Sequence, residues 1–95
     1  MLSPEIIRTA PKVLLHDHLD GGLRASTIIE LAKDLGVKSL PTDSVTELGD
    51  WMTATADRKD LELYLEAFSH TLSVMQTQDA LYRVAAECAE DLADD

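Results

Sequence analysis

Two histidines and an aspartate stand at alternate positions near the N-terminus, at His16, His18 and Asp20. In an extended strand, successive side chains point to opposite faces, so these three residues are expected on one side. Neutral imidazole is a good zinc ligand, but a catalytic zinc normally has three or more protein ligands and an open position for water. The spacing therefore predicts part of a metal site, whose remaining ligands come from elsewhere.

The residues before the histidines predict a short buried strand over Lys12–His16. Residues 13–15 are apolar without alternation, which is typical of a strand covered on both faces. The pair Gly21-Gly22 follows and permits a sharp turn. The histidines are thus expected at the end of a strand, next to a turn.

Helical periodicity accounts for most of the remaining chain, because apolar residues recur at three- and four-residue steps. Ser3 and Pro4 are a helix start signal, Gly36 is a stop signal, and Thr77 is a candidate N-cap. Helices are expected over residues 2–9, 27–35, a stretch through Trp51–Met52, 61–75 and 77–93. Thr27 and Glu30 are spaced as a capping box at the start of the second helix. Asp57–Asp60 is expected to be a polar connection between helices. The sequence predicts an α/β chain that is mostly helical, with one strand and about four helices after it.

Composition limits the partners that this chain can have. A chain of 95 residues is one domain at most, with a modest core. Eighteen acidic residues against eight lysines and arginines give a net charge of −10, which repels phosphate backbones and anionic lipid headgroups. We therefore expect neither a nucleic-acid polymer nor a membrane as partner. The single cysteine, Cys88, cannot close an internal disulfide, which fits a reducing compartment and makes the cytoplasm the expected location.

A single strand is the unusual feature of this pattern. Backbone groups that are buried without hydrogen bonds cost about 1–3 kcal/mol each, so a strand is not buried without a neighbour. We therefore expect the chain to be part of a longer protein. Alone, it is expected to fold partially, to aggregate or to form oligomers, because residues 13–15 expose an apolar edge.

The segment from Pro11 to Arg24 resembles the opening of the adenosine deaminase family, metal-dependent barrel enzymes of the amidohydrolase superfamily. A bare His-x-His pattern is weak, but its continuation by Leu-Asp-Gly over residues 19–21 is much more specific. The helix over residues 26–32 and the closing residues 86–95 are also similar to family segments. The resemblance implies that residues 1–95 are the N-terminal fragment of a metallo-dependent hydrolase with a (β/α)8 TIM barrel, a fold of roughly 250 residues.

The resemblance also implies roles for individual residues. His16 and His18 are expected to bind one zinc ion at the C-terminal end of the first strand, and His18 and Asp20 to approach the ribose 5′ hydroxyl of a purine nucleoside. Asp20 favours adenosine over adenine, because related adenine deaminases tend to have the longer Glu there. The implied reaction is hydrolysis of adenosine to inosine and ammonia, for which zinc lowers the pKa of its bound water. The catalytic groups are expected beyond Asp95, so the isolated chain is predicted to be inactive.

Other conspicuous residues have structural interpretations. Asp17 is expected to face away from the barrel axis and to pair with Lys12 or Arg24. His70 is expected at a helix surface or between helices. Cys88 is expected in the core, and Trp51 and Met52 are expected to cover the core. The alternative function is a non-catalytic, acidic helical interaction module formed by the 95 residues alone. The sequence leaves the oligomeric state open.

Overall fold

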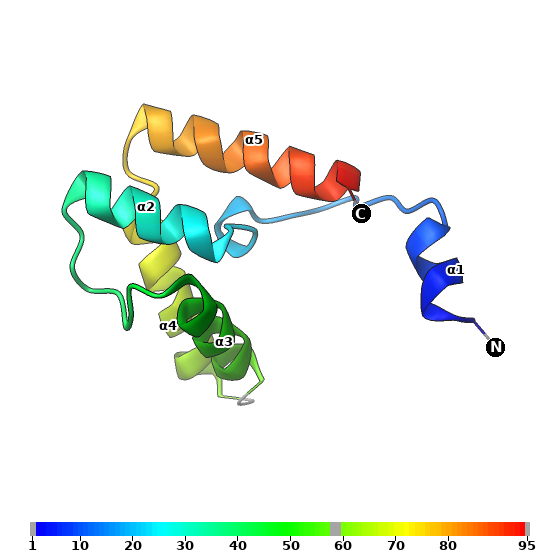
Figure 1. Ribbon diagram of the computed structural model, residues 1–95, viewed down its shortest axis with the longest axis horizontal. Helices are drawn as coiled ribbons and strands as arrows, with labels where there is room; N and C mark the ends of the chain where they lie inside the picture. Colours follow the sequence, from blue (N-terminus) through cyan, green and yellow to red (C-terminus); the bar gives the residue numbers. More distant parts are fainter. Residues whose placement is uncertain (1, 58–59, 95) are drawn as a thin grey trace.

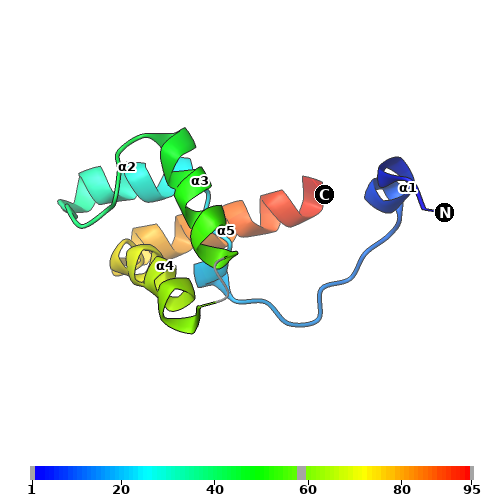
Figure 2. The ribbon, with the colours of Figure 1, turned by 90° about the horizontal axis from the view of Figure 1, so that it is seen from below.

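The computed structural model describes residues 2–57 and 60–94. In chain order, the elements in these ranges are α1 (Pro4–Thr9), the 3-10 helix η1 (Leu19–Gly21), α2 (Ala25–Leu35), α3 (Val45–Ala56), α4 (Leu61–Ser73) and α5 (Gln78–Asp94). In Figure 1, α2 and α5 run antiparallel, and α3 and α4 pack together below them. Figure 2 shows α1 apart from this bundle, at the far end of an extended segment. The mostly helical prediction is confirmed.

Local signals explain where several helices begin and end. The Ser3 hydroxyl accepts a hydrogen bond from the Ile6 backbone N–H, and Pro4 stands at the first helical position of α1. Gly36 ends α2 in the left-handed conformation, with φ 71°, which a residue without Cβ adopts at little cost. The Thr77 hydroxyl accepts from the Ala80 backbone N–H before α5. The sequence predicted these three boundaries correctly.

The start of α2 differs from its prediction. The helix begins at Ala25, two residues before the expected cap, so Thr27 lies inside its first turn and is buried. The capping box of Thr27 and Glu30 is therefore wrong, and the Thr27 hydroxyl donates to Glu87 of α5 instead. The predicted polar connection over Asp57–Asp60 includes residues 58 and 59, which lie outside the described residues.

The buried core is formed between the helices of the bundle. The central contribution comes from one face of α2, which is covered by α3, by the end of α4 and by α5. Its fully or nearly fully buried apolar members are Ile28, Ile29, Leu31, Ala32, Leu48, Val74, Ala80 and Val84. Among the described helices, none is long and apolar enough to cross a membrane.

The expected strand over Lys12–His16 is not formed in the part of the chain that the structure describes. Residues 11–14 have no regular structure and Leu15 lies at a bend. The side chains of Val13 and Leu15 are 84% and 93% exposed, as expected for an apolar edge without neighbouring strands, so the strand and its burial are not observed here. A strand needs hydrogen bonds to a neighbouring strand, and no residue in 2–57 or 60–94 belongs to one. The α/β part of the fold prediction is therefore unconfirmed.

Candidate metal centre

The two histidines of the predicted metal site point their rings at each other. Nε2 of His16 lies 3.1 Å from Nε2 of His18, and the ring centroids are 4.9 Å apart. The backbone at His18 is extended, with φ −115° and ψ 116°, so alternation still brings both rings to one side although no strand forms. Both residues are exposed. The two imidazoles are thus able to act on a single ligand.

A groove of about 620 Å³ begins at these histidines and is also lined by Asp20 of η1. Its opposite wall belongs to α4 and is apolar and aromatic, formed by Tyr64, Leu65, Phe68 and Leu72. The rings of Tyr64 and Phe68 meet edge to face, with centroids 5.4 Å apart. The groove therefore combines ring nitrogens and a carboxylate on one side with flat apolar surface on the other.

The α4 wall was not identified as part of the site from the sequence. Its members were assigned to the apolar stripe of a helix, which is typical of core residues. The structure leaves three of them exposed: Tyr64, Leu65 and Leu72. One sequence feature could have indicated this wall. Tyr64 and Phe68 are two aromatic residues one helical turn apart, on an apolar stripe that is wider than a small core can cover.

The turn after Asp20 is packed between α4 and α5. A Cβ atom on Gly21 would lie 3.7 Å from Cε1 of Phe68, and one on Gly22 would lie 3.5 Å from Sγ of Cys88. Both distances are ordinary van der Waals contacts for a Cβ atom, so the turn lies close to both helices, as the contacts of η1 with α4 and α5 also show. This packing fixes where the His16–Asp20 segment leaves the bundle.

Asp17 has other partners than the two that were predicted. Its Oδ1 accepts a hydrogen bond from the His18 backbone N–H at 2.9 Å, and its Oδ2 lies 3.7 Å from Sγ of Cys88. Lys12 binds backbone carbonyls and Arg24 pairs with acids of α5, so neither predicted partner reaches Asp17. Burial, together with the nearby Asp17 carboxylate, raises the pKa of the Cys88 thiol, which is therefore a neutral donor. The core position predicted for Cys88 is confirmed, since the residue is 8% exposed.

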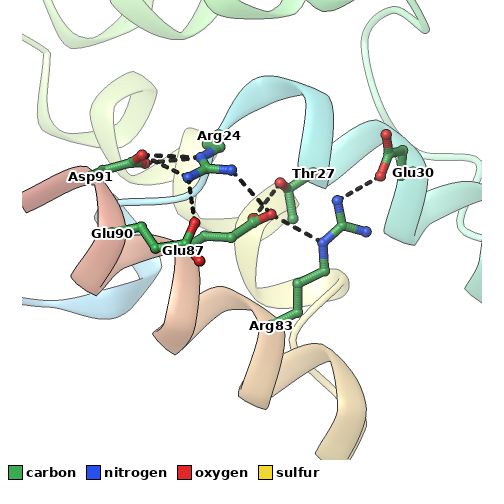
Figure 3. Close-up of polar contacts among 7 residues, drawn as sticks. All are labelled: Arg24, Thr27, Glu30, Arg83, Glu87, Glu90 and Asp91. Carbon is green, nitrogen blue, oxygen red and sulfur yellow. Dashed lines mark hydrogen bonds and ion pairs between the residues drawn. The ribbon is translucent and has the colours of Figure 1, made fainter. Parts of the chain in front are cut away.

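A network of ion pairs ties α2 to α5, as Figure 3 shows. Arg24, at the start of α2, binds acids near the end of α5, with Nη2 2.8 Å from Oδ1 of Asp91. Arg83 binds Glu30 and Glu87, and Glu87 also accepts from Thr27 and Arg24. Burial favours the neutral form of Glu87, but hydrogen bonds from Thr27 and Arg83 outweigh it, so the pKa of Glu87 is lowered. The hydrogen bond from Arg24 likewise lowers the pKa of Asp91.

The remaining structural predictions concern α3 and α4. The His70 ring packs edge-on against Trp51, with centroids 5.3 Å apart, so the interhelical position predicted for His70 is confirmed. Trp51 and Met52 pack against the buried core, also as predicted. His70 is accordingly a structural histidine, separate from the pair in the groove.

Comparison with known proteins decides the family. The sequence model described as "Adenosine deaminase" matches residues 11–95. The chain belongs to the adenosine deaminase family. It is 64% identical over 93 residues to adenosine deaminase 1 of Streptomyces coelicolor, and 57% identical over 89 residues to an adenosine deaminase of Mycobacteroides abscessus. It is also 56% identical over 94 residues to the adenosine deaminase of Mycobacterium avium.

These matches cover the chain almost completely but cover only a part of the relatives. In the order in which the relatives are named, the matches cover 98%, 94% and 99% of this chain. They cover 24%, 25% and 26% of the length of the relatives themselves. The chain thus spans about a quarter of the length of the adenosine deaminases that it matches. No solved structure matches the chain.

The adenosine deaminase family is generally metal-dependent, and the geometry of the two histidines is suitable for a shared ion. In a tetrahedral site with Zn–N distances of about 2.0–2.1 Å, two nitrogen ligands lie roughly 3.3 Å apart. The Nε2 atoms of His16 and His18, 3.1 Å apart, fit that separation. In residues 2–57 and 60–94, no group of three or more His, Cys, Asp or Glu side chains is arranged to hold a metal ion. The pair therefore fits as a part of a ligand set.

Proposed function

We propose that this chain supplies the first quarter of a zinc-dependent adenosine deaminase, which converts adenosine and water to inosine and ammonia. The observation that carries the proposal is the convergence of His16 and His18, with Nε2 atoms 3.1 Å apart, in a chain of this family. Three relatives that match nearly the whole chain are named adenosine deaminases.

Each residue of the groove has a role in this proposal. His16 and His18 bind the zinc ion through Nε2, and ligands from the rest of the protein complete the set. The Asp20 carboxylate accepts a hydrogen bond from the ribose 5′ hydroxyl and repels a 5′ phosphate, which favours a nucleoside over a nucleotide. When bound, zinc lowers the pKa of water and so supplies the nucleophile for purine C6.

The α4 wall of the groove has the properties of a nucleobase site. Tyr64 and Phe68 present ring surfaces next to the histidines, and aromatic rings pack well against the flat faces of purines. The apolar wall also excludes water from the side of the base opposite to the histidines. The groove therefore suits a ligand that is flat and apolar at one end and carries hydroxyls at the other.

The same proposal includes the fold of the whole protein. We propose that residues 12–16 become the first strand of a (β/α)8 barrel when neighbouring strands pair with them. The exposure of Val13 and Leu15 supports this proposal, because apolar side chains at 84% and 93% exposure are available for burial. A cytoplasmic location belongs to the proposal as well, on the basis of the single, unpaired Cys88.

A chimera tests the proposed activity. This chain replaces the matching quarter of the Streptomyces coelicolor adenosine deaminase 1, to which it is 64% identical. We expect zinc-dependent release of ammonia and formation of inosine from adenosine, with adenine a poorer substrate. Replacing either ligand, as His16→Ala or His18→Ala, should lower kcat/KM by at least roughly 100-fold, since even outer partners of metal ligands contribute 10–100-fold.

The matched control is His70→Gln, which changes the histidine outside the groove and should leave kcat/KM within about threefold. The 95-residue chain alone should show no turnover. An inactive chimera, or one that keeps its activity after His18→Ala, contradicts the proposal. If the chimera is inactive while the chain alone is a monodisperse monomer with cooperative unfolding, the acidic interaction module becomes the better account.

A further inference from the structure

The segment that carries the two histidines contacts α5 at Cys88. Before His18, Oδ2 of Asp17 lies 3.7 Å from the Cys88 sulfur. After Asp20, Gly22 lies near the same sulfur atom, since a Cβ placed on Gly22 would be 3.5 Å from it. Cys88 is 71 residues away from Asp17 in the sequence, so these contacts depend on the tertiary fold.

Asp17 uses its two carboxylate oxygens in different directions. Oδ2 faces the Cys88 thiol, while Oδ1 accepts from the His18 backbone N–H at 2.9 Å. A neutral thiol donates a weak hydrogen bond, and the carboxylate as acceptor strengthens it. The side chain of Asp17 therefore connects a buried residue of α5 to the backbone of one of the paired histidines.

The helix that provides Cys88 is itself held in place. Glu87 and Asp91, one residue before and three residues after Cys88, pair with Arg24 at the start of α2. Val84, one turn earlier, is 2% exposed in the core. Cys88 is therefore a rigid point relative to the bundle, and a contact with it restricts the segment.

We propose that Cys88 and Asp17 are positioning residues for the metal centre, with the thiol orienting the Asp17 carboxylate and the carboxylate orienting His18 toward His16. This proposal rests on the proposed function, because it concerns the zinc ligands. Its effect is on ligand alignment: with the Asp17 link removed, His18 rotates more freely and the two Nε2 atoms are together for less of the time. Fixed ligand orientation is what outer partners contribute to metal affinity.

Zinc affinity of variants tests the proposal. It is measured on the chimera by competition of the protein with a chelator for zinc. Cys88→Ala and Asp17→Ala should each weaken zinc binding roughly tenfold. Because both act through one contact, the double variant should lose little more than either single variant.

Two further variants separate positioning from packing. Cys88→Ser keeps a donor at the same place and should bind zinc within about threefold of the unchanged chain. Val84→Ala makes a larger core cavity on the same helix and should lower the Tm more than Cys88→Ala does, while zinc affinity stays within about twofold. In the metal-free chimera, the His18 amide should exchange its hydrogen faster after Cys88→Ala and Asp17→Ala but not after Cys88→Ser.

The outcomes distinguish this proposal from the proposed function. If Val84→Ala weakens zinc binding as much as Cys88→Ala, or if serine fails to restore it, the positioning role is wrong and the metal centre stands. If the chimera without these substitutions does not bind zinc, the metal centre is wrong and the positioning role fails with it.

Discussion

The bundle of α2–α5 and the N-terminal residues 2–18 differ in the burial and ion pairs that hold them in place. The bundle buries Ile28, Leu48 and Val74 completely and is tied across α2 and α5 by ion pairs. In residues 2–18, by contrast, no residue is buried. Helix α1 lies apart from the bundle in both views (Figures 1 and 2).

The paired histidines stand at the border between these two regions. His16 and His18 belong to the exposed segment, while Asp17, Gly21 and Gly22 reach the bundle. Most of the folding free energy of the described chain therefore comes from one region, and the proposed metal ligands come from the other. Substitutions in the two regions should therefore have separable effects on stability.

The largest difference is expected between two leucines. Leu48→Ala removes a completely buried side chain from the bundle and should cost about 2–5 kcal/mol of unfolding free energy. Leu15→Ala truncates a side chain that is 93% exposed and should change it by less than about 0.5 kcal/mol. Urea unfolding followed by circular dichroism measures both. Equal losses in the two variants would show that residues 12–16 are packed in solution.

Acid should loosen the bundle through the α2–α5 network. The pKa values of Glu87 and Asp91 are lowered in the folded chain, so both carboxylates stabilise it at neutral pH. This stabilisation is complete above the ordinary pKa values, 4.5 for Glu87 and 3.8 for Asp91. It is lost as the pH falls through the lowered pKa values of the folded chain. Unfolding free energy, measured between pH 7 and pH 3, should therefore decrease on acidification.

Glu87→Gln isolates the contribution of that carboxylate. It should cost about 1–2 kcal/mol at pH 7, because the partners of Glu87 are partly exposed to water, and it should flatten the acid dependence. Glu66→Gln, at an exposed position of α4, is the control and should leave the pH profile unchanged. If the unfolding free energy of the Glu87→Gln variant still decreases on acidification as much as that of the unchanged chain, Glu87 is not a cause of the acid dependence.

The smallest difference is expected between two helix caps of similar chemistry. Thr77→Ala removes the hydroxyl that accepts from Ala80 at the start of α5 and should cost about 1 kcal/mol. Ser3→Ala removes the equivalent bond to Ile6 at the start of α1 and should leave the main unfolding transition within about 0.5 kcal/mol. If both variants lower the transition equally, α1 unfolds together with the bundle.

Helices were predictable here because their signals are local. Ser3, Gly36 and Thr77 act through hydrogen bonds and backbone conformation within a few residues, so their types and spacing suffice. The capping box at Thr27 failed for a reason that lies far along the chain. The Thr27 hydroxyl is used by Glu87, which is 60 residues later and comes close only when α5 packs on α2.

The convergence of the two histidines was predictable, but the surroundings of the groove were not. Alternation of His16 and His18 places both rings on one side whether or not a strand forms, which is why their convergence could be expected. The partner of Asp17 could not be expected, because Cys88 reaches it only through the tertiary fold. A strand depends on pairing with a neighbouring strand, and a continuous apolar run cannot show whether that pairing is present.

The ion pair between Arg24 and Asp91 also has a consequence for protein synthesis. The two residues are 67 positions apart, and at translation rates of about 5–20 residues per second Asp91 is made roughly 3–13 s after Arg24. During that interval, the apolar face of the nascent α2 has no α5 to cover it.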